Sequence, residues 1–456
     1  MATESYSKEN IMHSSIKEDL KILYHFDDLS EFFMVDYYTE SGYELLPKPW
    51  LEIATNDHKV FLKQLCGSLL PEKTFDISVV MPLSLLCFIA LIRKKLSLRR
   101  RQLSAGNNLP ISCKTQLKFL KPKKILELSA MLPCVQKVIS DERISHIVDI
   151  GSGVGHVSRF IAKQNPSCSI LRIEAQSTLI NKAENIDERF DKASKPANIF
   201  SAVCRLNLDS NVVSSFIEIL QEADKANGTS FAQPNSRVLL LGLHPCGNLG
   251  SFMLRLFKGC GACQAIVIVS CCYMFIDKED DQKGGFPLSN VVEEQGIMSL
   301  SGQLKEQACH KAEFYLSRLL EQLKDPDNLA QNWRSIADIF LSKRDSKCSR
   351  TWFKFKKRSS GEGIVNFINK NLKLHKLTFL EKEEEELALE LSVVDQWRTW
   401  AYYLVYIVKL SLGVVGECVI LKDRLSFLLE CGYSSKFEIL FDPKESSRNV
   451  AIISSK

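Results

Sequence analysis

No charge of one sign dominates this sequence. Its 59 lysines and arginines face 54 aspartates and glutamates, so the net charge is only +5 over 456 residues. A balance this close to neutral does not by itself indicate nucleic-acid binding. Uncharged apolar runs of the roughly 20 residues that cross a membrane are also lacking. Residues 402–421 carry Lys409 and Glu417, and residues 79–92 are too short, so both segments are predicted to be core helices. A peripheral membrane contact stays open, because arginines and lysines follow residue 92.

Paired cysteine spacing is lacking too. The 15 cysteines are an odd number without the regular pattern of a disulfide framework. The first five residues are polar and of mixed charge, which does not resemble a secretory leader. We therefore expect reduced thiols and a cytoplasmic or nuclear location. The 45% hydrophobic and 25% charged residues fit a globular protein with a core of ordinary size plus a large addition.

Alternating strand and helix patterns begin near residue 144 and predict an α/β fold with a parallel sheet. Residues 1–135 are predicted to be a helical N-terminal region, and residues 136–276 the core domain. A largely helical insertion is expected over residues 277–400, after the fifth strand. Residues 401–456 would then return to the core as a long helix and an antiparallel hairpin. The expected strands cover residues 146–150, 169–174, 200–206, 237–243, 264–270, 436–441 and 449–454.

A glycine-rich turn follows the first predicted strand. Residues 147–155 read Ile-Val-Asp-Ile-Gly-Ser-Gly-Val-Gly. Gly151, Gly153 and Gly155 have no Cβ to keep a cofactor away from the backbone. Their spacing differs from the Gly-x-Gly-x-x-Gly of dinucleotide folds. With Asp149 two residues before the first glycine, the pattern is the variant that binds S-adenosyl-L-methionine, whose ammonium a nearby carboxylate can help to hold.

The second predicted strand ends in an acidic residue, Glu174, which lies 19 residues after Gly155. At this place in nucleotide-binding βαβ units a carboxylate accepts hydrogen bonds from the ribose hydroxyls. An ordinary turn with an exposed glutamate is the alternative interpretation, but the turn, the spacing and the acid agree. After the third strand, Asn207 and Asp209 are candidates for binding the adenine amino group. A helix N-cap is an equally good interpretation of these two residues, because an apolar-periodic segment follows them.

Chemically active side chains follow the next two predicted strands. The fourth strand runs into His244-Pro245-Cys246, and the fifth into Cys271-Cys272-Tyr273. Ligands of open α/β sheets bind at the carboxyl ends of the strands. Because these two strands are neighbours in this architecture, we expect the residues to meet at one rim beside the transferred methyl group. The candidate catalytic residues are His244, Cys246 and Tyr273.

Four interpretations of this rim stay open. His244 could act as a general base or position the acceptor, since imidazole titrates near neutral pH. Cys246 could be a nucleophile like that of cytosine-5 methyltransferases, which needs a lowered thiol pKa. The histidine and the cysteines could bind zinc, but adjacent cysteines rarely bind one ion and the spacing is not Cys-x-x-Cys, so no metal is expected. The thiols could also simply pack where strand and helix meet.

A basic stretch lies inside the predicted insertion. Residues 343–358 hold eight lysines or arginines against the single acid Asp345, with Trp352, Phe353 and Phe355 among them. Basic residues with interleaved aromatics can follow a phosphate backbone and stack on bases. A solvated loop is the simpler interpretation. Ribosomal or transfer RNA is therefore a candidate partner, and a protein substrate is not excluded.

Several motifs together resemble the methyltransferase-like protein 25 family, some of whose members are named ribosomal RNA adenine dimethylase domain-containing proteins. The similarity runs from about residue 30 to the C-terminus. Two departures are Leu126, where a histidine is usual, and Ser447, where a proline is usual. The matching motifs cover residues 46–50, 149–159, 244–249, 271–274, 285–289, 441–443 and 447–449.

The resemblance implies a class I (Rossmann-like) S-adenosylmethionine-dependent methyltransferase and leaves the acceptor open. Adenine N6-methyltransferases carry Asn/Asp-Pro-Pro-aromatic after strand four, whereas residues 243–246 read Leu-His-Pro-Cys, so adenine dimethylation is not supported. The His-x-Cys-Gly motif followed by Cys-Cys is similar to tRNA acceptor-stem 2′-O-methyltransferases, which favours RNA slightly. The alternative is a catalytically inactive methyltransferase fold that serves as a scaffold or RNA-binding module.

Overall fold

The structure is a computed structural model in which the chain forms two compact units. Unit 1 comprises Met1–Ile22, Arg99–Lys311 and Val415–Lys456, and unit 2 comprises Leu23–Leu98 and Ala312–Val414. The four-part domain division predicted from the sequence stays a prediction. The structure describes residues 2–56, 58–74, 78–99, 120–190, 198–206, 211–277, 284–323, 332–336, 338, 363–374, 396–443, 446 and 448–456.

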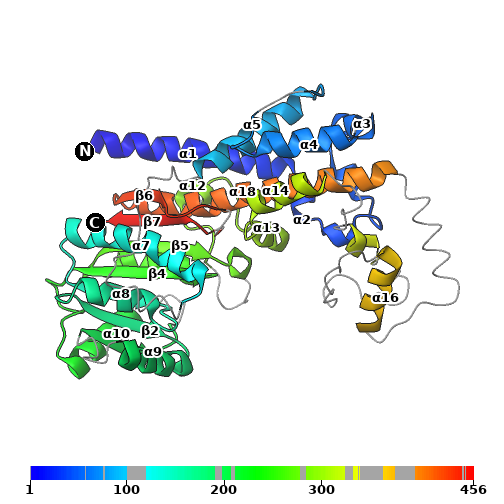
Figure 1. Cartoon of the computed structure of the whole chain (residues 1–456). Coiled ribbons are helices and arrows are strands. Elements are labelled where there is room, and N and C mark those ends of the chain that lie inside the picture. The colour runs from blue at the N-terminus through cyan, green and yellow to red at the C-terminus, as the bar shows by residue number, and fades with distance from the viewer. Residues whose placement is uncertain are drawn as a thin grey trace. The chain divides into compact units, whose positions relative to one another are not determined.

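Unit 1 contains a seven-stranded sheet with the strand order β3-β2-β1-β4-β5-β7-β6 (Figure 1). Strands β1 to β5 are parallel, whereas β7 runs antiparallel to both β5 and β6. The predicted α/β fold with an antiparallel C-terminal hairpin is therefore confirmed. The strands are β1 (His146–Ile150), β2 (Ser169–Glu174), β3 (Ile199–Val203), β4 (Val238–Cys246), β5 (Cys263–Cys271), β6 (Ser434–Ile439) and β7 (Val450–Ser455).

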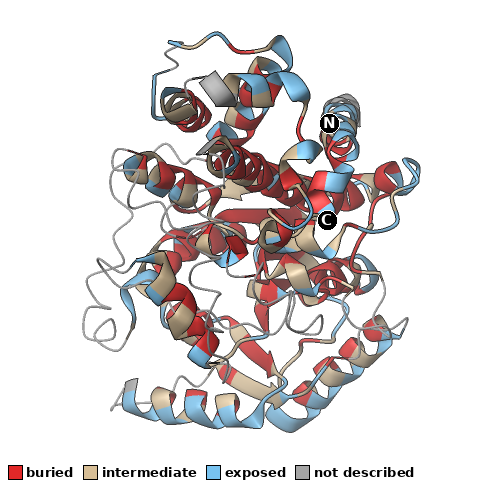
Figure 2. Cartoon of the chain, turned by 90° about the vertical axis from the view of Figure 1, so that its right-hand side faces the viewer, coloured by how far each residue is buried: buried red, intermediate tan, exposed pale blue. Residues whose placement is uncertain are grey.

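Helices cover both faces of this sheet, which explains why its strands read as continuous apolar runs. Every residue of β1 is buried, and successive side chains point to opposite faces. Ile147 packs with α7 (Pro122–Asp141) and α8 (His156–Gln164). Val148 packs with α10 (Val212–Asn227), with α11 (Leu249–Gly259) and with the C-terminal part of α18 (Gln396–Glu430). In Figure 2 the strands are accordingly coloured mostly as buried.

The other described elements are helical. In unit 1 they are α1 (Ala2–His25, which continues into unit 2), α9 (Ser177–Phe190), η4 (Tyr273–Phe275), α12 (Asn290–Glu293) and α13 (Gly302–Gln307). In unit 2 they are α2 (Asp27–Glu31), η1 (Met34–Asp36), η2 (Gly42–Leu45), α3 (Lys48–Asn56), α4 (His58–Leu69), α5 (Leu83–Leu98), α14 (Ala312–Gln322) and α16 (Ile364–Leu374).

Helix α18 is long and apolar enough between Trp397 and Glu430 to cross a membrane, yet 89% of its most apolar window is buried within the fold. Its charged groups make internal contacts. The ammonium of Lys409 donates to the carbonyl oxygens of Leu29 and Phe32, at 2.7 and 2.6 Å. Burial lowers the pKa of Lys409 to about 8. These contacts are those of a core helix. A buried core helix can be as long and as apolar as a helix that crosses a membrane.

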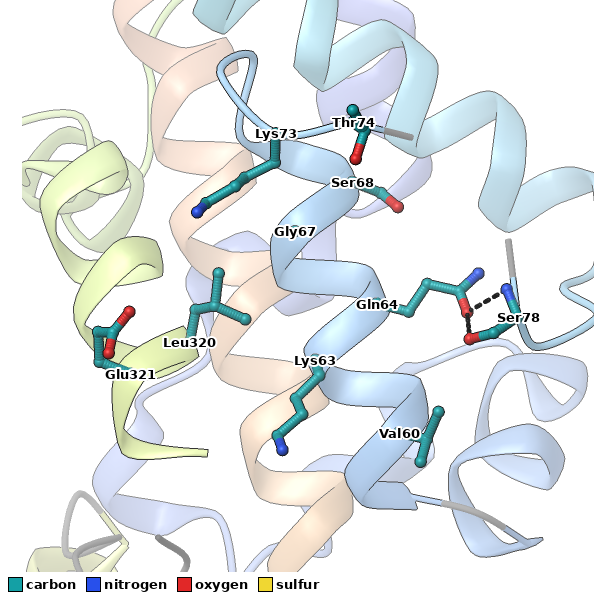
Figure 3. Close-up of a pocket in the computed structure, with 10 residues that line it drawn as sticks. All are labelled: Val60, Lys63, Gln64, Gly67, Ser68, Lys73, Thr74, Ser78, Leu320 and Glu321. Carbon is teal, nitrogen blue, oxygen red and sulfur yellow. Dashed lines mark hydrogen bonds between the residues drawn. The ribbon is translucent and has the colours of Figure 1, made fainter. Parts of the chain in front are cut away.

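Unit 2 also contains a cavity of about 370 Å³ beside α4 (Figure 3). Gln64 lines the cavity, and its Oε1 accepts hydrogen bonds from the backbone N–H and the hydroxyl of Ser78 at 2.9 and 2.8 Å. None of the site residues predicted from the sequence lines this cavity. Its lining residues are Val60, Lys63, Gln64, Gly67, Ser68, Lys73, Thr74, Ser78, Leu320 and Glu321.

Candidate cofactor and acceptor site

The three glycines after β1 all have left-handed backbone conformations. Their φ angles are 69° at Gly151, 56° at Gly153 and 69° at Gly155, a region in which a Cβ is strained. The space around them differs. Apart from its neighbours in the chain, no described residue has an atom within 4 Å of where a Cβ on Gly153 would stand. A Cβ on Gly155, in contrast, would lie 2.6 Å from Cζ of Arg172. The middle glycine therefore has an open face, and the third packs closely against the interior.

Glu174, at the end of β2, contacts this open glycine. Its Oε2 accepts a hydrogen bond from the backbone N–H of Gly153 at 2.9 Å, and its Oε1 accepts one from the N–H of Gln176 at 3.1 Å. The structure thus brings together the predicted glycine turn and the predicted ribose-binding acid. The carboxylate lies where a ligand that covers Gly153 would meet it.

Asp149 is buried beneath the turn. The hydroxyl of Ser158, in α8, donates a hydrogen bond to Oδ2 of Asp149. Burial raises the pKa of this carboxyl group, against the opposing effects of the Ser158 hydrogen bond and the Arg172 charge. Asp149 therefore ties β1 to α8 across the turn and supports the turn from below. Asn207 and Asp209, the other two predicted cofactor residues, lie outside the described residues.

A buried ionic network behind the turn was missed by the sequence analysis. Asp187 of α9 binds Nε of Arg159 at 2.6 Å and Nη1 of Arg172 at 2.7 Å. All three side chains are at most 2% exposed. The available signal was Arg172 itself, a charged residue between the apolar Leu171 and Ile173 in the middle of β2. The network fixes the guanidinium of Arg172 directly behind Gly155.

The carboxyl ends of β4 and β5 bring three cysteines together. Cys246 pairs with Cys271 in the sheet register. Their Sγ atoms are 3.5 Å apart, as are those of Cys271 and Cys272. The Cys271 hydrogen bond lowers the pKa of the Cys246 thiol, while the same hydrogen bond and burial raise that of Cys271. Cys246 is exposed, Cys272 is half-buried and Cys271 is buried, so the cluster opens on one side.

His244 lies at the same end of β4 and binds an acidic partner that the sequence analysis did not name as a site residue. Its Nε2 is 3.1 Å from Oε1 of Glu127, in α7. Burial raises the pKa of Glu127, but the hydrogen bond and charge of His244, with Lys124 and Lys123, outweigh burial and lower it to about 2. Glu127 is therefore ionised at neutral pH. The sequence did offer one indication of Glu127: it follows Leu126, the residue that replaces the usual histidine of the family pattern.

Tyr273 points into the interior. It is 1% exposed, and its hydroxyl donates to Oε1 of Glu417 at 3.2 Å. The other carboxylate oxygen of Glu417 binds Nη1 of Arg99 at 2.8 Å. Burial raises the pKa of Tyr273. A catalytic role for Tyr273 finds no support in this position, because its hydroxyl is bound inside the fold and anchors the end of β5.

Part of the chain is similar to a known protein family. Residues 121–279 match the family model described as "Methyltransferase domain". This range contains the glycine turn, Glu174, His244 and the cysteine cluster. The match covers residues 121–279 of the 456, and the strand order of unit 1 is that of the predicted class I (Rossmann-like) methyltransferase fold.

Two curated relatives are similar to the chain. The "Probable methyltransferase-like protein 25" of Homo sapiens is 25% identical over an alignment of 252 residues that covers 48% of this chain and 37% of the human protein. The Mus musculus protein of the same name is 26% identical over 243 residues, with the same coverage. The matched part of this chain thus spans less than two fifths of the length of these relatives.

Solved methyltransferase structures share only a distant likeness. The plantazolicin methyltransferase BpumL in complex with SAH is 14% identical, with a TM-score of 0.21 and coverage of 53% of this chain and 80% of that chain. Coclaurine N-methyltransferase, bound to N-methylheliamine and SAH, is 11% identical, with a TM-score of 0.22 and coverage of 96% and 98%. Likeness at this level carries no argument about function.

Proposed function

We propose that this chain is an S-adenosylmethionine-dependent methyltransferase whose acceptor is a hydroxyl group of RNA. One observation carries the cofactor half of this proposal. The open face of Gly153 adjoins the Glu174 carboxylate, which accepts a hydrogen bond from the Gly153 N–H at 2.9 Å. A nucleoside with a free ribose diol fits such a place, because the backbone admits it closely and the carboxylate can accept from the hydroxyls.

Gly151 and Gly153 would hold S-adenosylmethionine against the backbone, and Glu174 would bind its ribose. Gly155 lets the turn pack closely against Arg172. When bound, the cofactor supplies an electrophilic methyl group. Asp149 supports the turn through Ser158 and does not need to touch the ligand for this role. Methyl transfer to a hydroxyl then requires a group that takes up the hydroxyl proton, and this group must lie at the carboxyl ends of the strands.

His244 meets that requirement. If the neutral imidazole donates Nε2–H to Glu127, Nδ1 is left as a proton acceptor. Among the described residues none forms a hydrogen bond to Nδ1. When Nδ1 takes up a proton, the ionised Glu127 stabilises the resulting imidazolium, as a carboxylate partner does for a catalytic histidine. We therefore assign His244 as the general base and Glu127 as its positioning residue.

RNA as the acceptor rests on two sequence features. The basic, aromatic-containing residues 343–358 suit a phosphate backbone and lie outside the described residues. The His-x-Cys-Gly and Cys-Cys motifs are similar to those of tRNA 2′-O-methyltransferases. In addition, a histidine base can take up the proton of a ribose hydroxyl directly. A cytoplasmic or nuclear location, expected from the reduced cysteines, agrees with such a substrate.

Extracts of cells that lack this protein provide the test. RNA and protein fractions, incubated with the recombinant chain and methyl-labelled cofactor, should take up label in RNA as 2′-O-methylribose. His244→Ala should lower the transfer rate by roughly 10²–10⁴-fold, the usual contribution of a general base, with binding of S-adenosylhomocysteine retained. His25→Ala, which removes an exposed histidine of α1, is the matched control and should leave transfer unchanged.

Three results would contradict this account. Label confined to the protein fraction would refute the RNA acceptor. Label in RNA that survives His244→Ala would refute the general base. RNA binding without any methyl transfer would favour the alternative of an inactive RNA-binding module.

A further inference from the structure

The cysteine cluster at the ends of β4 and β5 has the dimensions of a metal site. The Sγ atoms of Cys246, Cys271 and Cys272 all lie within 4.8 Å of one another, and two of the three pairs are 3.5 Å apart. Zinc binds thiolates at about 2.3 Å in a tetrahedral arrangement, which separates neighbouring sulfurs by roughly 3.8 Å. Shifts of a few tenths of an ångström at the 3.5 Å pairs would bring these sulfurs to that separation.

The backbone explains how two adjacent cysteines reach one point. Side chains of consecutive residues in a continuing strand point to opposite faces. Cys272 leaves the strand in a left-handed conformation, with φ 50° and ψ 48°. Its Sγ therefore lies beside that of Cys271. On β4, an irregularity between Leu243 and Cys246 sets Cys246 opposite Cys271.

Burial and charge also suit a bound cation with thiolate ligands. Cys271 is buried and Cys246 is exposed, so an ion on the three sulfurs would keep one coordination position open to the rim. Three protein ligands with an open fourth position are the pattern of zinc sites that bind water or substrate. Three thiolates with one Zn²⁺ carry a net charge of −1. The guanidinium group of Arg448 supplies positive charge near Cys246.

We propose that Cys246, Cys271 and Cys272 bind one zinc ion, whose fourth position is open at the carboxyl ends of β4 and β5. The proposal is independent of the assigned acceptor and of the His244 base. It differs from the expectation based on sequence spacing, because spacing does not reveal that the turn at Cys272 brings neighbouring sulfurs together. A disulfide is the competing state, but a distance of 3.5 Å is well beyond the S–S bond length of about 2.05 Å.

Metal titration of the full-length chain tests this inference. The protein, stripped by a chelator and kept reduced, should bind one Zn²⁺ per chain. Co²⁺ should give a thiolate-to-metal absorption band with the intensity of three thiolates. Cys246→Ser, Cys271→Ser and Cys272→Ser should each weaken Zn²⁺ binding at least tenfold and reduce the cobalt band. Cys87→Ser, which removes an exposed cysteine of α5, is the matched control and should bind like the wild type.

The wild-type protein gives a second measurement that does not depend on how the variants fold. Added Zn²⁺ should slow the alkylation of Cys246, Cys271 and Cys272 and leave that of Cys87 unchanged. Substoichiometric zinc, zinc binding that survives all three substitutions, or a Cys246–Cys271 disulfide in the reduced preparation would overturn the proposal. S-adenosylhomocysteine binding is measured in parallel. A zinc failure with intact cofactor binding would refute the metal site alone.

Discussion

Replacing Asp187 with alanine is expected to lower the free energy of unfolding by roughly 3–5 kcal/mol. The reason is that Asp187 is the shared partner of two buried guanidinium groups, those of Arg159 and Arg172, at 2.6 and 2.7 Å. Without it, the buried guanidinium groups of Arg159 and Arg172 lose the carboxylate that both contact. Urea unfolding followed by circular dichroism measures the effect.

The control for this prediction is an ion pair on the surface, with its charged atoms at a similarly short distance. Lys436 and Glu438 are 3.2 Å apart, with side chains 55% and 38% exposed. Glu438→Ala should change the free energy of unfolding by less than about 1 kcal/mol, because water screens an exposed pair. An Asp187→Ala loss as small as the control would show that the network does not stabilise the fold.

Replacing Gly155 with alanine is expected to cost roughly 2–5 kcal/mol of folding free energy. The left-handed backbone contributes about 1–2 kcal/mol of strain, and overpacking contributes about 1–3 kcal/mol. The added Cβ would lie 2.6 Å from Cζ and Nε of Arg172. Although Arg172 has a long side chain, Asp187 holds its end, so it cannot move aside at low cost.

Gly153→Ala separates the two contributions. Its φ of 56° lies in the same left-handed region, but its Cβ would meet no described residue within 4 Å apart from its neighbours in the chain. This variant should therefore show only the strain of about 1–2 kcal/mol. Equal losses in the two variants, measured by the same urea unfolding, would contradict the contact between Gly155 and Arg172.

The features that the sequence predicted correctly depend on local patterns. Apolar runs bounded by turn residues located all seven strands, and the run of three alternating glycines predicted the turn after β1. The prediction for β4 ended at residue 243, whereas the strand continues to Cys246. The reason is pairing with β5, which resumes at Cys246 after an irregularity. Pro245 has no N–H to donate to the ladder there.

The features that the sequence analysis missed depend on contacts between distant residues. Asp187 lies 28 residues after Arg159 and 15 after Arg172, with no pattern that couples them. Glu127 and His244 meet because α7 packs on the sheet and brings Glu127 to the carboxyl end of β4, where His244 lies. No local spacing in the sequence reveals this contact. Tyr273 was expected at the rim because it follows β5. The left-handed turn at Cys272 and the buried Glu417 direct it inward instead.

Calorimetric titration with S-adenosylhomocysteine tests most directly the central claim that the glycine turn and Glu174 hold the cofactor. The account predicts one site per chain with a dissociation constant on the order of micromolar. It also predicts loss of binding in a folded Gly153→Arg variant, whose side chain would fill the open face. Absence of binding to the wild-type chain, or micromolar binding that persists in Gly153→Arg, would contradict the claim.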